Sequence, residues 1–113
     1  MEKKLNTTYT FEFYDGTTTE MTLTFYKLYQ LKSKDRALYD KYTKILSIKH
    51  PDELDMIEML YVAYICAHLS EEVENLITFE DFMMKCGSDR DELGKATTAL
   101  MRPKKHQASA KRS

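Results

Sequence analysis

Apolar and polar residues alternate along residues 9–25. The apolar ones fall into two groups of three: Tyr9, Phe11 and Phe13, then Met21, Leu23 and Phe25. A period of two is that of a β-strand, whose side chains point alternately to its two faces. The pattern therefore predicts a β-hairpin near the start of the chain.

The residues between the two strands offer two turns. Asp15-Gly16 is typical of a two-residue turn, but that register places Phe11 opposite Glu20. A three-residue loop that ends at Gly16, in the left-handed conformation, places Phe11 opposite Thr19 instead. We predict the second register, because it keeps the apolar face on one side of the hairpin.

Beyond residue 25 the apolar spacing changes to three and four, which is the period of an α-helix. Pro51 is placed to open one helix, Thr78 and Ser88 to cap two more, and Gly87 to end the helix between them. Five helices are predicted, over residues 25–31, 35–46, 51–69, 78–86 and 88–101.

These elements predict an α+β fold, in which an N-terminal β-hairpin packs on a mostly helical domain of about five helices. The chain has 113 residues, enough for one domain, which we assign to residues 1–101. A two-stranded hairpin is marginal alone, so its apolar face must lie on the helices or its edges must pair with another chain. The sequence leaves open whether the protein forms a homo-oligomer.

Charge divides the chain unevenly. Residues 102–113 hold five of the 17 basic side chains and no acidic one, so residues 1–101 hold 12 basic and all 18 acidic side chains, a net charge of −6. Because phosphate contacts need a basic surface, nucleic-acid binding by the domain is unfavourable. We predict that residues 102–113 are a flexible basic tail, with an arm that touches an acidic partner or nucleic acid as the alternative.

Residues that carry chemistry are few and scattered. Cys66 and His68 lie two apart on a predicted helix and so face different ways, and Cys86 is distant, which disfavours a zinc site. No glycine loop for phosphate and no nucleophile motif is present. We expect no cofactor, no metal and no catalytic site. Cysteine spacing, and the lack of a signal peptide or membrane-span pattern, favour a cytoplasmic protein.

The segment from residue 54 to residue 66 is apolar nearly all round. A helix of this kind is either enclosed in the core or covers a partner with its second side. Tyrosines at helical spacing elsewhere suit a core boundary or an interface. Candidate partner-binding residues lie on the second side of this helix, off the apolar face of a later helix, or on the hairpin: Met56, Met59, Ala63, Met84, Tyr9 and Phe11.

Four stretches together suggest a family. They are the hairpin YTFEFYDGTTTEMTLTF, the helical LYQLKSKDRALYDKY, the apolar MIEMLYVAYICAH, and the closing TFEDFMMKCGSDRDELGKATTALM, which Pro-Lys-Lys soon follows. In element order and length, residues 9–101 resemble the tail assembly chaperones of long-tailed phages and prophages of Gram-positive bacteria. The resemblance implies a non-enzymatic protein of the bacterial host cytoplasm, not expected in the mature virion. Its implied partners are the tape-measure protein, which it keeps soluble, and the major tail protein.

The resemblance also bears on the end of the chain. Members of that family are often made in two forms, the longer one by a programmed ribosomal frameshift near the end of the short reading frame. Codons for Lys104 and Lys105 can supply the A-rich run on which ribosomes slip. The resemblance thus implies a longer product that diverges near Lys104.

The alternative is a small phage-type helix-turn-helix protein that binds DNA, with the basic tail on phosphate. Its recognition helix would be SDRDELGKATTAL, which opens with three acidic residues. We prefer the chaperone, because acidic side chains at that position repel the DNA backbone.

Removal of residues 102–113 tests whether the domain ends at Met101. We expect the shortened chain to keep its free energy of unfolding within about 0.5 kcal/mol of the full chain, as is usual for changes away from the core. Denaturant titration of both chains measures the difference. A large loss of stability would show that these residues belong to the fold.

Overall fold

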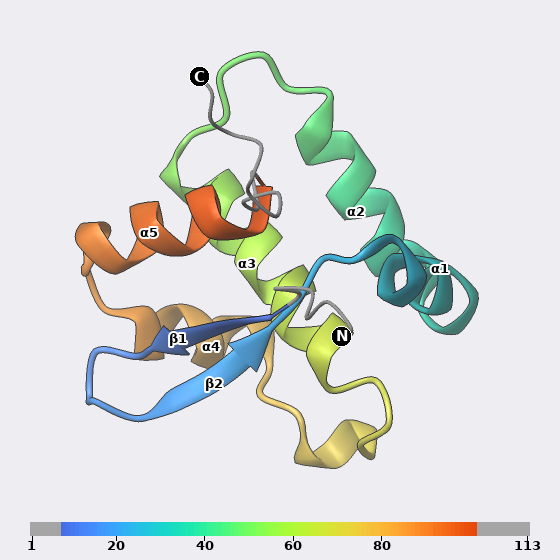
Figure 1. Ribbon diagram of the computed structural model, residues 1–113, viewed down its shortest axis with the longest axis horizontal. Helices are drawn as coiled ribbons and strands as arrows, with labels where there is room; N and C mark the ends of the chain where they lie inside the picture. Colours follow the sequence, from blue (N-terminus) through green and yellow to red (C-terminus); the bar gives the residue numbers. More distant parts are fainter. Residues whose placement is uncertain (1–7, 102–113) are drawn as a thin grey trace, which may run out of the picture.

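The computed structural model describes residues 8–101. The predictions for residues 102–113 lie outside the described residues. The elements, in chain order, are β1 (Tyr9–Glu12), β2 (Thr18–Met21), α1 (Phe25–Lys34), α2 (Arg36–Leu46), α3 (Glu53–Ala67), the 3-10 turn η1 (Val73–Asn75), α4 (Phe79–Cys86) and α5 (Arg90–Met101). An antiparallel hairpin packed against five helices confirms the predicted α+β fold (Figure 1).

The hairpin has the predicted register. Phe11 lies opposite Thr19, and Gly16 adopts a φ of 91°, in the left-handed region. The Asp15 carboxylate stabilises the loop. Its Oδ1 accepts hydrogen bonds from the backbone N–H of Thr17 at 3.0 Å and from the Thr17 hydroxyl at 2.7 Å. This loop keeps the apolar side chains of both strands on one face.

Helix α3 is the centre of the fold and contacts β2, α1, α2, α4 and α5 (Figure 1). Its buried residues lie on every side of its C-terminal half: Met59, Leu60, Val62, Ala63, Tyr64, Ile65 and Cys66. The apolar character all round this helix is thus explained by enclosure in the core.

The predicted start of α3 was two residues too early. Asp52 and Asp55 form a capping box, in which each carboxylate accepts a hydrogen bond from the backbone N–H of the other at 2.9 Å. This reciprocal arrangement satisfies donors that a helix start leaves free. The helix therefore begins at Glu53, with Pro51 before the cap, and it ends at Ala67.

The ends of α4 are as predicted, whereas the start of α5 differs. Thr78 caps α4, and Gly87 ends it with a positive φ of 62°. Asp89 accepts a hydrogen bond from the backbone N–H of Glu92 at 3.1 Å. Asp89, rather than the predicted Ser88, therefore caps α5, since its carboxylate is one residue nearer the free N–H groups of the first turn.

Phe82 of α4 joins the hairpin to the helices. Its side chain is fully buried, and its ring centre lies 6.3 Å from that of Phe11 and 5.7 Å from that of Phe13. On the helical side, the ring centres of Tyr61 and Tyr64 lie at 5.3 and 5.8 Å. The hairpin thus gains the packing partner that two strands alone lack.

Truncation of Phe82 tests this role. We expect Phe82→Ala to lower the free energy of unfolding by about 3–5 kcal/mol, because it removes a buried ring and leaves a cavity. Met84 is the matched control on the same helix, since its side chain is 72% exposed. Met84→Ala should stay within about 0.5 kcal/mol of the unmodified chain. Equal effects in denaturant titration would contradict the assignment.

Candidate functional site

Helix α1 has two apolar sides. Leu28 and Leu31 are buried, and the helix packs against α2 and α3. Phe25, Tyr26 and Tyr29 are exposed, because at 3.6 residues per turn their positions fall on a different arc of the helix. The apolar positions of this helix therefore divide between a buried side and an exposed side.

These three aromatic residues form one exposed surface, which we call the α1 aromatic face. Phe25 is 91% exposed, Tyr26 66% and Tyr29 67%. The two tyrosine rings stack on each other with their centres 6.4 Å apart. Helix α1 lies at one end of the molecule, and the hairpin turn lies at the other (Figure 1). An exposed cluster of large apolar side chains marks an interaction surface.

Hydrogen bonds at both ends hold α1 in place. The Thr24 hydroxyl accepts from the backbone N–H of Lys27 at 3.3 Å and caps the helix. Asp35 ends α1 by donating its backbone N–H to the carbonyl of Leu31 at 2.7 Å, and its carboxylate caps α2 by accepting from Leu38 at 3.1 Å. The aromatic face is thus carried on a short helix that is fixed directly to the next one.

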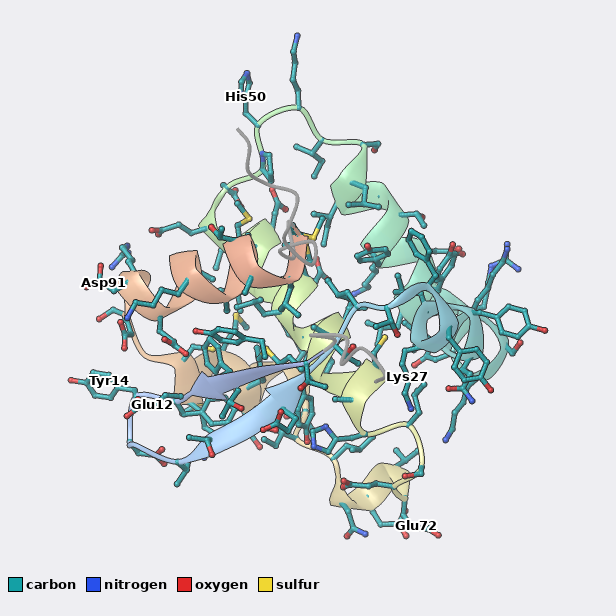
Figure 2. All side chains as sticks on the ribbon, in the orientation of Figure 1. Glu12, Tyr14, Lys27, His50, Glu72 and Asp91 are labelled. Carbon is teal, nitrogen blue, oxygen red and sulfur yellow. The ribbon has the colours of Figure 1, made fainter. Side chains whose placement is uncertain are left out.

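The charge of α1 differs from that of the described chain as a whole. The helix contains three lysines, Lys27, Lys32 and Lys34, and no acidic residue. Residues 8–101 outside it contain seven basic and 17 acidic side chains. Lys27 lies toward the α1 end, whereas Glu12 and Asp91 lie at the opposite end (Figure 2). Helix α2, which packs against α1, contains Arg36, Lys41 and Lys44 and one acidic residue, Asp40, so the aromatic face stands at a basic end of a molecule that is acidic elsewhere.

Three of the predicted partner-binding residues are buried: Met59, Ala63 and Phe11 are 3%, 0% and 2% exposed. Met59 and Ala63 are enclosed by the elements around α3, and Phe11 packs on the aromatic core. Their side chains cannot reach a partner while the domain is folded. For these three residues the structure therefore corrects the prediction, and their role is in the core.

The other three predicted residues lie on separate elements. Met56 of α3 is half-buried and packs against the core. Tyr9 of β1 is half-buried, and its hydroxyl donates to Glu92 Oε2 at 3.0 Å. Met84 of α4 is 72% exposed. The structure does not bring the predicted residues together into one surface, and the sequence reasoning missed the aromatic face of α1.

Glu92 of α5 accepts hydrogen bonds from β1 of the hairpin. Its Oε2 accepts a second hydrogen bond, from the backbone N–H of Glu12 at 2.9 Å. Burial, with the adjacent Glu92 carboxylate, raises the pKa of the Tyr9 hydroxyl to about 12. The first turn of α5 therefore contacts β1 through Glu92. The same turn contains a second acidic residue, Asp91.

A cavity of about 270 Å³ lies between the α1–α2 junction, the end of α3 and η1. Most of its lining is apolar: Leu31, Leu38, Ile65, Leu69, Val73, Leu76 and Ile77. Two of its polar side chains are engaged within the protein. The Tyr61 hydroxyl donates to the carbonyl of Ile77 at 2.7 Å, and His68 Nδ1 lies 2.8 Å from the carbonyl oxygen of Tyr64. The cavity is therefore mainly hydrophobic.

The two cysteines are free and buried. Burial raises the pKa of the Cys66 thiol to about 12 and that of Cys86 to about 11. Within residues 8–101, no group of three or more His, Cys, Asp or Glu side chains is placed to hold a metal ion. None of the helices in that range combines the length and apolar character that a membrane crossing requires.

Comparisons with known proteins add no relative. The chain matches no family model, no curated protein and no solved structure. Its function is therefore inferred from its own residues and their arrangement.

The buried thiols predict a loss of stability at alkaline pH. Their folded pKa values lie above the ordinary value of 9, so folding favours the protonated thiols. That contribution is complete below about pH 9 and is lost as the pH rises through the folded values. Urea titrations at pH 8 and pH 10 should show a lower midpoint at pH 10. The Cys66→Ala, Cys86→Ala double variant should lose less; an equal loss would exclude the thiols as a cause.

Proposed function

We propose that the protein is a non-enzymatic chaperone of phage tail assembly, which binds the tape-measure protein and assists assembly of the tail tube. The observation that carries the proposal is the α1 aromatic face, a binding surface on a stable helix. The order of elements, a hairpin followed by helices, supports it further, since the resemblance of residues 9–101 to that family rests on this order.

An exposed aromatic face suits a protein that binds a long helical chain. Large aromatic side chains contribute much of the binding energy at protein interfaces, and an amphipathic helix is recognised through its apolar stripe. One small face gives weak affinity, but many copies along a long partner gain by multivalency. Transient coverage of this kind keeps apolar segments of the partner from aggregating.

The proposal includes the location of the protein, its second partner and its longer form. It acts in the cytoplasm of the bacterial host and is released before the virion is complete. The major tail protein is the second partner. A longer form, made by a frameshift near Lys104, would carry the same domain.

The arrangement of α5 disfavours the helix-turn-helix alternative. A recognition helix must bring its first turns into the major groove. Here the first turn carries Asp91 and Glu92, and the Glu92 carboxylate is engaged with β1. Negative charge at that end opposes contact with the DNA backbone.

Co-expression with the tape-measure protein of the same phage or prophage tests the proposal. We expect the tape-measure protein, expressed alone, to be largely insoluble and, expressed with this chain, to move to the soluble fraction. The two proteins should then co-purify, because the chain covers apolar stripes of the partner. An unchanged soluble fraction would contradict the proposed function.

A further inference from the structure

We infer that the α1 aromatic face is the docking surface for an acidic amphipathic helix of a protein partner. The apolar stripe of that helix would cover Phe25, Tyr26 and Tyr29, and its acidic side chains would be attracted by the positive charge that α1 and α2 carry together. The inference rests on the proposed function and deepens it, by naming the chemistry of the segment that is recognised.

The aromatic face differs from the other exposed apolar residues of the described chain. Tyr14, Leu54, Val73 and Met84 are also more than 60% exposed, but each stands on a different element, and Tyr14 projects from the hairpin turn (Figure 2). Single exposed apolar residues are normal for a protein surface. On α1 three large rings occur within five residues, while the core beneath them is already closed by Leu28 and Leu31. The rings are therefore not needed for folding.

Charge selects an acidic occupant. Helix α1 has a charge of +3, whereas the described residues outside it have a net charge of −10, from seven basic and 17 acidic side chains. Helix α2, which packs against α1, adds a net charge of +2 from Arg36, Lys41, Lys44 and Asp40. An acidic partner is therefore attracted to the end that α1 and α2 form and repelled by the acidic remainder, which favours one docking position over others. A basic partner would bind preferentially elsewhere.

The shape of the face suits a helix. Helix α1 has ten residues, so it is about 15 Å long and can lie beside about three turns of a partner helix. Phe25 and Tyr29, at positions i and i+4, lie along one ridge of the helix, and such a ridge packs into a groove of a neighbouring helix. The matching partner carries apolar residues at i, i+3, i+4 and i+7, with Asp or Glu on both sides of that stripe.

A nucleic acid fits these observations less well. Its affinity depends on the number of phosphates that basic side chains neutralise. Helix α1 offers three lysines, of which Lys32 lies with its Nζ 5.5 Å from the centre of the Tyr39 ring. A long polyanion that extends past α1 meets the acidic remainder of the domain.

A pair of synthetic peptides tests the inference on the full chain. Both form an amphipathic helix of about three to four turns with the same leucine stripe; one has glutamates beside the stripe and the other lysines. We expect the glutamate peptide to bind at least about tenfold more tightly in fluorescence anisotropy, with an affinity that weakens as salt is added. Equal binding of the two peptides would overturn the inference.

Variants place the binding on α1. Replacing Phe25, Tyr26 and Tyr29 together by alanine should weaken binding of the glutamate peptide about tenfold or more, and Lys32→Glu should weaken it by a smaller factor. Met84→Ala is the matched control, with an exposed side chain on another element, and should bind as the unmodified chain does. Circular dichroism checks that each variant is folded. Unchanged binding by the folded triple variant would overturn the inference, as would tighter binding of single-stranded DNA than of the peptide.

The same triple variant separates this inference from the proposed function. If the unmodified chain keeps the tape-measure protein soluble and the triple variant does so equally well, the docking surface is wrong while the function stands. If neither chain has an effect, the proposed function fails, and the peptide comparison still decides what α1 binds.

Discussion

The fold depends on the burial of Phe82 among rings from the hairpin and from α3. A hairpin of two four-residue strands is marginally stable at best on its own, and α4, with eight residues, is short for a helix in isolation. Each stabilises the other through the Phe82 ring. Two rings of the hairpin and two of α3 pack around it: Phe11, Phe13, Tyr61 and Tyr64. Burial of aromatic surface, rather than strand pairing, joins the β part to the α part.

The same closure decides where a partner can bind. Once the hairpin, α4 and α5 cover one side of α3, and α1 and α2 cover the other, α3 presents little of its apolar surface to solvent. Met59 and Ala63 are buried by this packing, although their residue types suit an interface. Helix α1 lies at the margin of this packing and has only one side covered, so its second apolar side remains exposed.

Local signals made most of the fold predictable from the sequence. The hairpin register follows from keeping Phe11 on the apolar face, and the ends of α4 follow from Thr78 and Gly87, because these features act over a few residues. The starts of α3 and α5 were misplaced by one or two residues, since Pro51 suits the first position of a helix and Ser88 is as good a capping residue as Asp89. Which residue caps a helix depends on the local backbone conformation, which the amino-acid sequence does not state.

The candidate site was less predictable, for a physical reason. Periodicity shows that a residue is apolar at helical spacing, but it does not show how many sides of a helix its neighbours cover. In α1, Phe25 and Tyr29 satisfy the helical spacing as well as Leu28 and Leu31 do, and tertiary packing alone distinguishes the two pairs. A helical projection of residues 25–34 does contain a usable signal: two apolar arcs on a helix of ten residues, with three lysines and no acid. One arc is sufficient to attach so short a helix, so a second arc of large rings indicates a surface kept for another molecule.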